Sequence, residues 1–287
     1  GVYGNTFAGG GFDPLYGALR NHAGTIGAEL IDLFGGPDLT DPEIVQLGAM
    51  VREFLPKSLG ADFGLAGIVL GAVGDDAELA PVVLGNRVDD YLIGLGLVAA
   101  DEGRVSDAQI VGNVFQDNLA GILGISSMDG VIRRTTVQGN RIQVGGTDKL
   151  NAILDGIGYG DVLEVPNGGL VGIGFASIDG SEIRHTQIVG NQISGAAVGV
   201  LGAGIYGDID DFRVLDNMLR DNLIGVAGLA YGGSADVEGF VVRRNAIVGG
   251  GVTELLDILV SGRDGKAVFE GAFEAGGFET SCFIRSP

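Results

Sequence analysis

The feature that most constrains the fold is an asparagine that returns about every 27 residues. Self-similarity at such a period is typical of stacked supersecondary units, each of which buries its apolar face against its neighbours. The repeated asparagines are Asn86, Asn113, Asn140, Asn167, Asn191, Asn217 and Asn245.

Apolar residues recur at fixed offsets from these asparagines. Three residues before the asparagine stand Val83, Ile110, Val137, Ile188, Val214 and Val242, and two after it stand Val88, Phe115, Ile142, Ile193, Leu219 and Ile247. A second, glycine-rich apolar strand follows about eight residues later. A unit of this size with short strands and no helical pattern is too small for a propeller blade, and it lacks the leucine-rich spacing. We therefore predict an all-β fold, a parallel β-helix of about eight coils.

The asparagines have a structural role in this interpretation. A short amide side chain tolerates the left-handed backbone of a corner, and amides stacked about 4.8 Å apart can hydrogen-bond to one another. We expect the seven asparagines to form an internal ladder and to take no part in catalysis, because buried polar groups persist where they are hydrogen-bonded.

Two stretches carry a family resemblance. Residues 110–122 (IVGNVFQDNLAGI) and 214–226 (VLDNMLRDNLIGV) resemble repeats of the right-handed parallel β-helix, the pectin-lyase-like superfold, and the resemblance covers about residues 59–272. It implies the hand of the coil. Members that cut acidic polysaccharides carry calcium-binding carboxylates with an Arg or Lys base, or paired aspartates with a Gly-His-Gly motif.

The chain lacks these catalytic signatures. It has no Gly-His-Gly, and its only histidines are His22 and His185. Asp210 and Asp211 are adjacent, which in a strand sends them to opposite faces, a poor arrangement for acid and base work. We expect no complete active site and lean towards a protein that is not an enzyme.

The ends of a β-helix need covers, because an open end presents unpaired backbone. The Thr40-Asp41-Pro42-Glu43 capping box precedes apolar residues at helical spacing, so residues 1–58 are predicted to be a glycine-rich tail and a helical cap, with the cap over 40–58. The β-helix is predicted over 59–272 and a C-terminal cap or tail over 273–287.

One repeat departs from the pattern. At Asn167 the preceding residue is Pro166, and Glu164 stands at the expected inward apolar position. Residues 141–171 are either a distorted coil or a loop that leaves the stack. The distorted coil is favoured, because residues 152–156 fall where a strand is expected.

The charge balance limits the partners. With 17 basic and 37 acidic residues, the formal net charge is -20. Nucleic acid and anionic membranes are poor partners for such a field. The acidic surface favours solubility, or an environment rich in cations or carbohydrate. The single cysteine, Cys282, has no assigned role and allows no intrachain disulfide, and no apolar run is long enough for membrane insertion. We expect an extracellular or cell-surface location.

Charged clusters are the only candidates for binding. Acidic residues recur about a dozen positions before the asparagines, where we expect a solvated corner or a row bridged by cations, so calcium is the one candidate cofactor and no metal site is assigned. Arg133, Arg134, Arg184 and His185 share an offset, and they either grip uronic-acid sugars or pair with nearby carboxylates. The candidate ligand- or cation-binding residues are Asp129, Asp179, Asp208, Asp210, Asp211, Arg134, Arg184 and His185.

Two functions remain open. The first is a non-catalytic structural protein of the cell surface or extracellular space that assembles with itself into an array, fibre or appendage, with the tail 1–11 adding to a neighbouring copy. The alternative is a pectin-lyase-like protein that binds or degrades acidic polysaccharide. The absence of Trp and the presence of only six Tyr disfavour the aromatic platforms of such grooves.

Overall fold

The computed structural model describes residues 1–8, 64–145, 168–231, 235–248, 258–263 and 267–270. These residues form β-strands numbered β1 to β25, and no helix occurs among them. The predicted caps at 40–58 and 273–287 lie outside the described residues.

The strands belong to three sheets. Sheet A contains β1 (Val2–Tyr3), β4 (Glu78–Leu79), β5 (Val82–Leu84), β8 (Arg104–Ser106), β9 (Gln109–Val111), β12 (Val131–Arg133), β13 (Thr136–Gln138), β16 (Glu182–Val189), β19 (Asp208–Leu215), β22 (Val237–Arg243) and β25 (Ala267–Glu270). Sheet B contains β2 (Thr6–Ala8), β6 (Arg87–Asp89), β10 (Val114–Asn118), β14 (Arg141–Val144), β17 (Gln192–Ser194), β20 (Met218–Arg220) and β23 (Ala246–Val248). Sheet C contains β3 (Gly64–Val73), β7 (Tyr91–Ala100), β11 (Ala120–Ser127), β15 (Gly169–Ile178), β18 (Ala196–Ile205), β21 (Ile224–Tyr231) and β24 (Ile258–Arg263).

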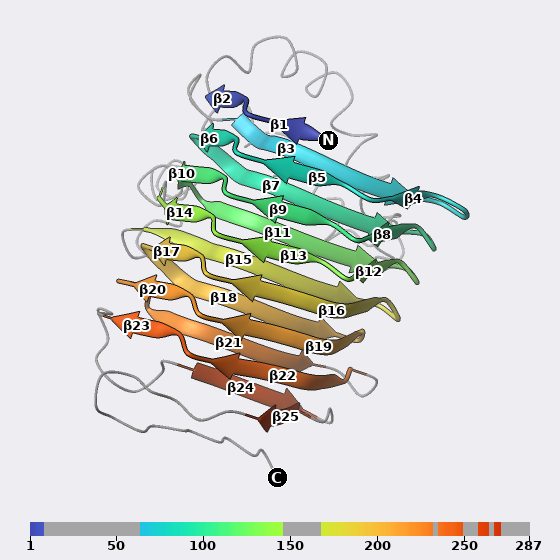
Figure 1. The fold of residues 1–287 in the computed structure, drawn as a ribbon. Coiled ribbons are helices and arrows are strands. Elements are labelled where there is room, and N and C mark those ends of the chain that lie inside the picture. The colour runs from blue at the N-terminus through green and yellow to red at the C-terminus, as the bar shows by residue number, and fades with distance from the viewer. Residues whose placement is uncertain (9–63, 146–167, 232–234, 249–257, 264–266, 271–287) are drawn as a thin grey trace, which may run out of the picture.

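Each coil runs through sheet C, then sheet A, then sheet B, and pairs in parallel with the coils before and after it (Figure 1). The predicted all-β parallel β-helix is confirmed. Seven stacked strands in sheet C correspond to about six turns, fewer than the eight expected. The hand of the coil stays a prediction.

The core lies inside the coil, where the repeat predicts it. Val83, Ile110 and Val137 stack in sheet A, Val88, Phe115 and Ile142 stack in sheet B, and all of these side chains are buried. Farther along the stack, the rings of Phe175, Phe212 and Phe240 pack in sequence, with centroids 5.9 Å and 5.0 Å apart. The core is thus a set of aligned side-chain rows.

A glycine makes room for one of these rings. Gly124 lies opposite Phe175 in the sheet C ladder, and a Cβ at Gly124 would come within 2.4 Å of the Phe175 ring. Because real Cβ atoms do not approach other atoms so closely, only glycine fits there.

The N-terminal tail is part of the helix. β1 pairs with β5 in sheet A and β2 pairs with β6 in sheet B, so these two strands stack on the coil that contains β5 and β6. Residues 2–3 and 6–8 therefore belong to the stack, although the prediction had assigned them to a tail outside the β-helix. Pairing of the tail with its own coils also removes the reason for expecting it to add to a neighbouring copy.

The stack bypasses the irregular repeat. β15 pairs directly with β11, and β17 pairs directly with β14, so no coil stands between these layers. The favoured interpretation of 141–171 as a distorted coil is wrong, because β14 ends one coil, β15 begins the next, and residues 146–167 are inserted between them. Two other undescribed stretches, 9–63 and 249–257, likewise connect a sheet B strand to the next sheet C strand.

Candidate functional site

The ladder of asparagines is continuous and buried. Asn140 shows the pattern: its Oδ1 accepts from the backbone N–H and the Nδ2 of Asn113 at 2.8 and 3.0 Å. Its own Nδ2 donates to the Ile110 carbonyl and to Oδ1 of Asn191, each at 2.9 Å. The same bonds link Asn86, Asn113, Asn140, Asn191, Asn217 and Asn245. Six predicted rungs therefore lie in the ladder as structural residues.

Asn5 is a rung that the sequence analysis missed. Its backbone N–H donates to Oδ1 of Asn86 at 2.9 Å. Val2 and Phe7 stand at the repeat's two apolar offsets from Asn5, so the signal was present in the sequence. Asn167 lies outside the described residues, and the ladder passes from Asn140 to Asn191 without it.

The left-handed corner belongs to the residue before each asparagine. That residue has positive φ in every described coil, and the set is Gly4, Gly85, Gly112, Gly139, Gly190, Asp216 and Arg244. The expectation that the asparagine itself takes the left-handed conformation is wrong, because the ladder asparagines are not among the described residues with positive φ. Proline has a fixed negative φ, so Pro166 already argued against Asn167 as a rung.

A second asparagine position, also missed, supports the next corner. Asn118 Oδ1 accepts the backbone N–H of Tyr91 at 2.9 Å, and Asn222 Oδ1 accepts that of Ala196 at 2.9 Å. Both side chains are buried. The signal was an Asp-Asn-Leu triplet five residues after the ladder asparagine, in two coils.

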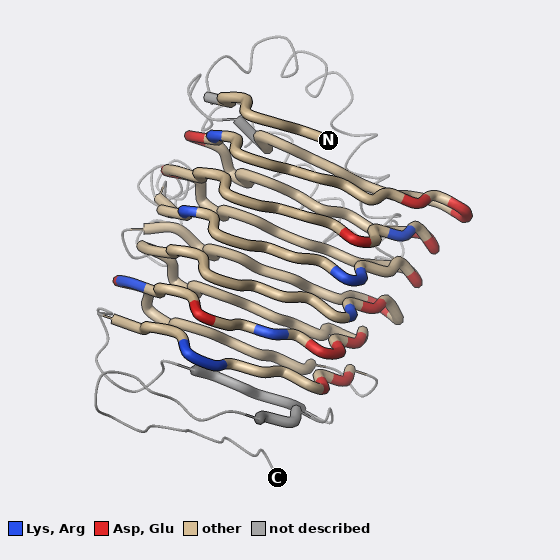
Figure 2. Tube along the Cα trace, viewed as in Figure 1, with Lys and Arg blue, Asp and Glu red and all other residues tan. Residues whose placement is uncertain are grey.

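Acidic residues lie at the turns that follow the sheet C strands β3, β7, β11 and β15, whereas Asp208 lies within β19 (Figure 2). Asp101 and Glu102 have φ of 52° and 65°, and Gly103 N–H donates to the Ala100 carbonyl at 2.9 Å. Asp129 and Asp179 occupy the corresponding turns, also with positive φ. Aspartate suits such turns because its short side chain tolerates the left-handed region. The corner placement of Asp129 and Asp179 is as predicted, and binding of cations there stays a prediction.

Asp208, Asp210 and Asp211 do not converge. Asp208 Oδ1 accepts the backbone N–H of Asp236 at 3.0 Å. Asp210 pairs in register with Arg184, whereas Asp211 bonds to His185 at 3.0 Å and to Arg213 at 2.5 Å. Among the residues that the structure describes, no three His, Cys, Asp or Glu side chains come together as a group that could hold a metal ion.

The basic residues share a register, as the equal offsets predict. Arg133 lies opposite Arg184, and the Arg134 N–H donates to the Arg184 carbonyl at 2.9 Å. The Arg134 guanidinium makes two bonds with Asp107, at 2.7 and 2.8 Å, and Arg184 bonds to Glu182 at 2.5 Å. These side chains therefore pair with nearby carboxylates, the simpler of the two interpretations.

Ion pairs lower the pKa of Asp107 and Asp211, and the hydrogen bonds from Arg244 lower the pKa of Asp216 in the same way. The hydrogen bonds from Arg134 lower the pKa of Asp107 below its usual value, and the charges of Arg134 and Arg133 add to this effect. Burial acts to raise the pKa of Asp211, but the hydrogen bonds from His185 and Arg213 outweigh it and lower the pKa. All three carboxylates are thus held in the ionised form.

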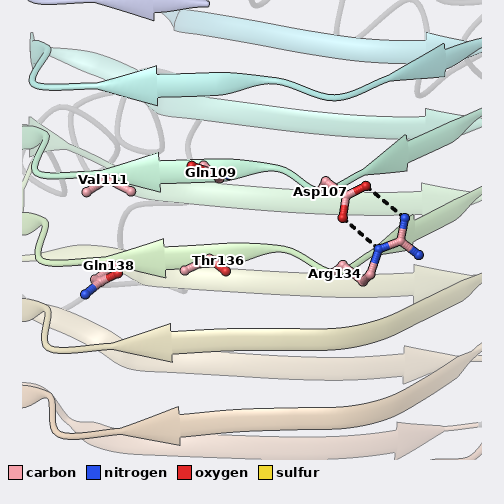
Figure 3. Close-up of a pocket in the computed structure, with 6 residues that line it drawn as sticks. All are labelled: Asp107, Gln109, Val111, Arg134, Thr136 and Gln138. Carbon is pink, nitrogen blue, oxygen red and sulfur yellow. Dashed lines mark hydrogen bonds and ion pairs between the residues drawn. The ribbon is translucent and has the colours of Figure 1, made fainter.

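A shallow depression lies on the outer face of sheet A beside the Arg134–Asp107 pair (Figure 3). Its volume is about 350 Å³. The residues that line it are Asp107, Gln109, Val111, Arg134, Thr136 and Gln138. Amide, hydroxyl and charged groups here could bind a polar ligand such as a sugar.

The outer face of sheet C has a different character. Strands β3, β7, β11, β15, β18 and β21 contain no charged residue. Side chains alternate along each strand, and Leu95 and Leu97 point into the core. One outward row is Val69, Gly96, Leu123, Gly174, Leu201 and Ala227, and the next is Gly71, Val98, Ile125, Ala176, Ala203 and Leu229. Strands that are apolar on both faces are typical of sheets covered on both sides.

No helix among the described residues is long and apolar enough to cross a membrane. Comparison with family models, with curated proteins and with solved structures found no match. The likeness to the pectin-lyase-like superfold therefore rests on the repeat and on the parallel stack.

Proposed function

We propose that this chain is a non-catalytic structural β-helix of the cell surface or extracellular space that assembles with copies of itself. The observation that carries the proposal is the absence of any charged residue from six strands of sheet C, β3, β7, β11, β15, β18 and β21, in a chain whose net charge is -20. Val69 and Val73 on the first of these strands are 61% and 52% exposed, and exposed apolar side chains gathered on one face typically mark an interaction site. The buried ladder at the corner between sheets A and B supports the proposal, because it fixes the stacking of the coils and so the regular spacing of the sheet C strands.

The test is the size of the full chain in solution. We expect sedimentation velocity to show species larger than the 29.3 kDa chain, with a share that grows with protein concentration. A single 29.3 kDa species at every concentration from micromolar to near-millimolar would contradict self-assembly. Labelling of intact source cells with an antibody tests the surface location, and signal only after permeabilisation would contradict it.

The depression on sheet A supports a second candidate, binding of acidic polysaccharide. Its polar groups suit sugar hydroxyls, and Arg134 suits a uronate carboxylate. A glycan screen with and without calcium tests this candidate, with Arg134→Ala and Gln138→Ala expected to weaken any binding. Cleavage of a uronate polymer would overturn the non-catalytic assignment.

A further inference from the structure

A row of charged side chains on the outer face of sheet A changes sign halfway along the stack. The row, called here the charged row, consists of Arg133, Arg184, Asp210 and Glu238, which pair in register from one coil to the next. Figure 2 shows the basic segments of β12 and β16 above the acidic segments of β19 and β22. The order of signs along the stack is therefore plus, plus, minus, minus.

The charged row points to solvent. The residue before each of its members is buried, and these residues are Ile132, Ile183, Ile209 and Val237. Because side chains alternate in direction along a strand, the charged row itself lies on the outer face. The side chains of Arg133 and Arg184 are 36% and 49% exposed, and Asp210 and Glu238 are exposed. The row is thus accessible to a partner.

Within one chain the charged row places like charges side by side. Arg133 lies opposite Arg184 and Asp210 lies opposite Glu238, about 4.8 Å apart, and like charges opposite each other destabilise a sheet. Both arginines reach a carboxylate of their own chain, Arg133 at 3.4 Å and Arg184 at 2.5 Å. Neither Asp210 nor Glu238 has a side-chain hydrogen bond or ion pair with another residue that the structure describes. Opposite charges from outside the chain would relieve this row.

We infer that two copies of this chain pack sheet A against sheet A as a two-fold dimer, with the charged row of one copy lying on that of the other. A two-fold contact requires a surface that is complementary to itself. A row with the signs plus, plus, minus, minus meets this requirement, because turned end over end it presents minus, minus, plus, plus. The inference rests on the proposed self-assembly and names a surface for it.

The order of signs selects the direction of the two-fold axis. An axis parallel to the strands, between the coils of Arg184 and Asp210, would place Arg184 opposite Asp210 of the second copy. It would also place Arg133 opposite Glu238 of the second copy, and each contact would occur twice. An axis along the stacking direction through the row would bring each charge onto its own counterpart, and like charges repel.

The rows on either side of the charged row add one favourable and one unfavourable contact. Val189 and Leu215 are in register and half-buried on the outer face, so each would pack against the other in the second copy. In the row on the other side, Glu182 would face Asp208 of the second copy. Glu182 is already bonded to Arg184 at 2.5 Å, which weakens that repulsion.

The test is charge reversal at the two ends of the row in the full chain. Arg133 and Glu238 are three coil steps apart, roughly 14 Å, so they do not pair within one chain. Arg133→Glu would oppose two carboxylates across the dimer, and Glu238→Arg would oppose two guanidinium groups. The double variant Arg133→Glu/Glu238→Arg restores opposite charges only between copies. Arg141→Glu, at an exposed position on sheet B, is the matched control, because it changes the net charge as Arg133→Glu does.

Sedimentation velocity in about 0.15 M salt measures the dissociation constant, since charges more than about 8 Å apart are then screened and contacting charges are screened much less. We expect each single reversal to raise the dissociation constant on the order of 10-fold or more. The double variant and Arg141→Glu should stay within about threefold of wild type. Glu238→Arg lowers the net negative charge and should still weaken the dimer, which separates local pairing from overall repulsion.

Circular dichroism checks that each variant is folded, and the two single reversals test the same contact independently. An oligomer that neither single reversal weakens, or that the double variant does not restore, would overturn the inference and leave self-assembly through another surface standing. A wild type that stays a 29.3 kDa monomer would overturn both the inference and the proposed self-assembly.

Discussion

Asn140 and Asn191 are 51 residues apart in the chain and are adjacent rungs of one ladder, since both the N–H and the Nδ2 of Asn140 donate to Oδ1 of Asn191 at 2.9 Å. The chain on either side of the insertion is held just as closely. Gly145 N–H donates to the Asn118 carbonyl and Leu170 N–H donates to the Leu119 carbonyl, at 2.9 and 2.7 Å. Two consecutive residues at the preceding corner, Asn118 and Leu119, therefore hold both ends of the insertion.

Removal of residues 146–167 should leave the β-helix intact. With a three-residue Gly-Ser-Gly linker in their place, we expect the free energy of unfolding to stay within about 1 kcal/mol of wild type, because the cost of loop closure changes slowly with loop length. Urea denaturation measures this free energy. Deletion of an equally long piece of the stack, 119–140, is the control and should abolish the cooperative transition. Equal damage from both deletions would show that the insertion is required for folding.

Removal of the buried rung Asn140 should lower the free energy of unfolding more than removal of Asn5 at the exposed end of the ladder. Asn140→Ala removes a buried side chain that takes part in four hydrogen bonds and leaves buried partners unsatisfied, so we expect a loss of about 2–4 kcal/mol. Asn5 is exposed at the end of the ladder, and Asn5→Ala should cost about 1 kcal/mol or less. Urea denaturation of both variants tests the difference. Equal losses of unfolding free energy would mean that burial does not determine how much a rung stabilises the fold.

The left-handed position before the ladder asparagine should tolerate aspartate and reject valine. Gly112 has φ of 63°, and a Cβ there would have no atom within 4 Å, so the backbone conformation alone sets the cost. Asp216 occupies the same position in a later coil. We expect Gly112→Asp to cost about 0.5 kcal/mol and Gly112→Val about 1–2 kcal/mol in thermal denaturation. A Val variant as stable as the Asp variant would contradict this explanation.

The pair between His185 and Asp211 gives a pH dependence with a definite sign. The pKa of Asp211 is lowered in the folded state, so its contribution to stability is complete above the ordinary carboxyl pKa of about 3.9 and is lost as the pH falls through the lower, folded value. Arg213→Ala removes one of the two stabilising hydrogen bonds and should raise the pKa of Asp211. Carboxyl ¹³C titration by NMR measures that rise.

The same variant should lose stability only where Asp211 is ionised. The pair is partly exposed, so the loss should stay below about 1 kcal/mol at pH 6 and disappear once the pH falls below the lowered, folded pKa of Asp211. A stability difference that persists at low pH would show that Arg213 acts through packing and not through its charge.

The regular part of the fold could be predicted because each coil repeats the same inward pattern. Val83, Ile110 and Val137 were assigned to the core from their offset alone, and each is fully buried. Asn5 escaped the same analysis because 81 residues separate it from Asn86, and a period of about 27 is hard to follow across such a gap. Asn167 was included because its spacing fits the period, although a proline before it cannot form the corner.

The charged residues of the outer faces were harder to assign. Equal offsets of Arg133 and Arg184 predict that they share a register, and they do. The bond between Arg134 and Asp107 depends on the left-handed conformation of both residues, with φ of 53° and 55°. Offsets along a sequence do not reveal which residue of a corner takes that conformation.

All three undescribed stretches between sheet B and sheet C join the coil at one corner, after β2, β14 and β23. Asn140 and Asn191, the rungs on either side of residues 146–167, are hydrogen-bonded like any other neighbouring rungs. The length of the sequence inserted at that corner therefore does not change the spacing of the coils. Insertions, deletions and replacements at that corner could accumulate in evolution without any change in the core side chains. For the same reason, a foreign peptide could be grafted there. The corner after each sheet B strand is the position at which this fold tolerates insertions.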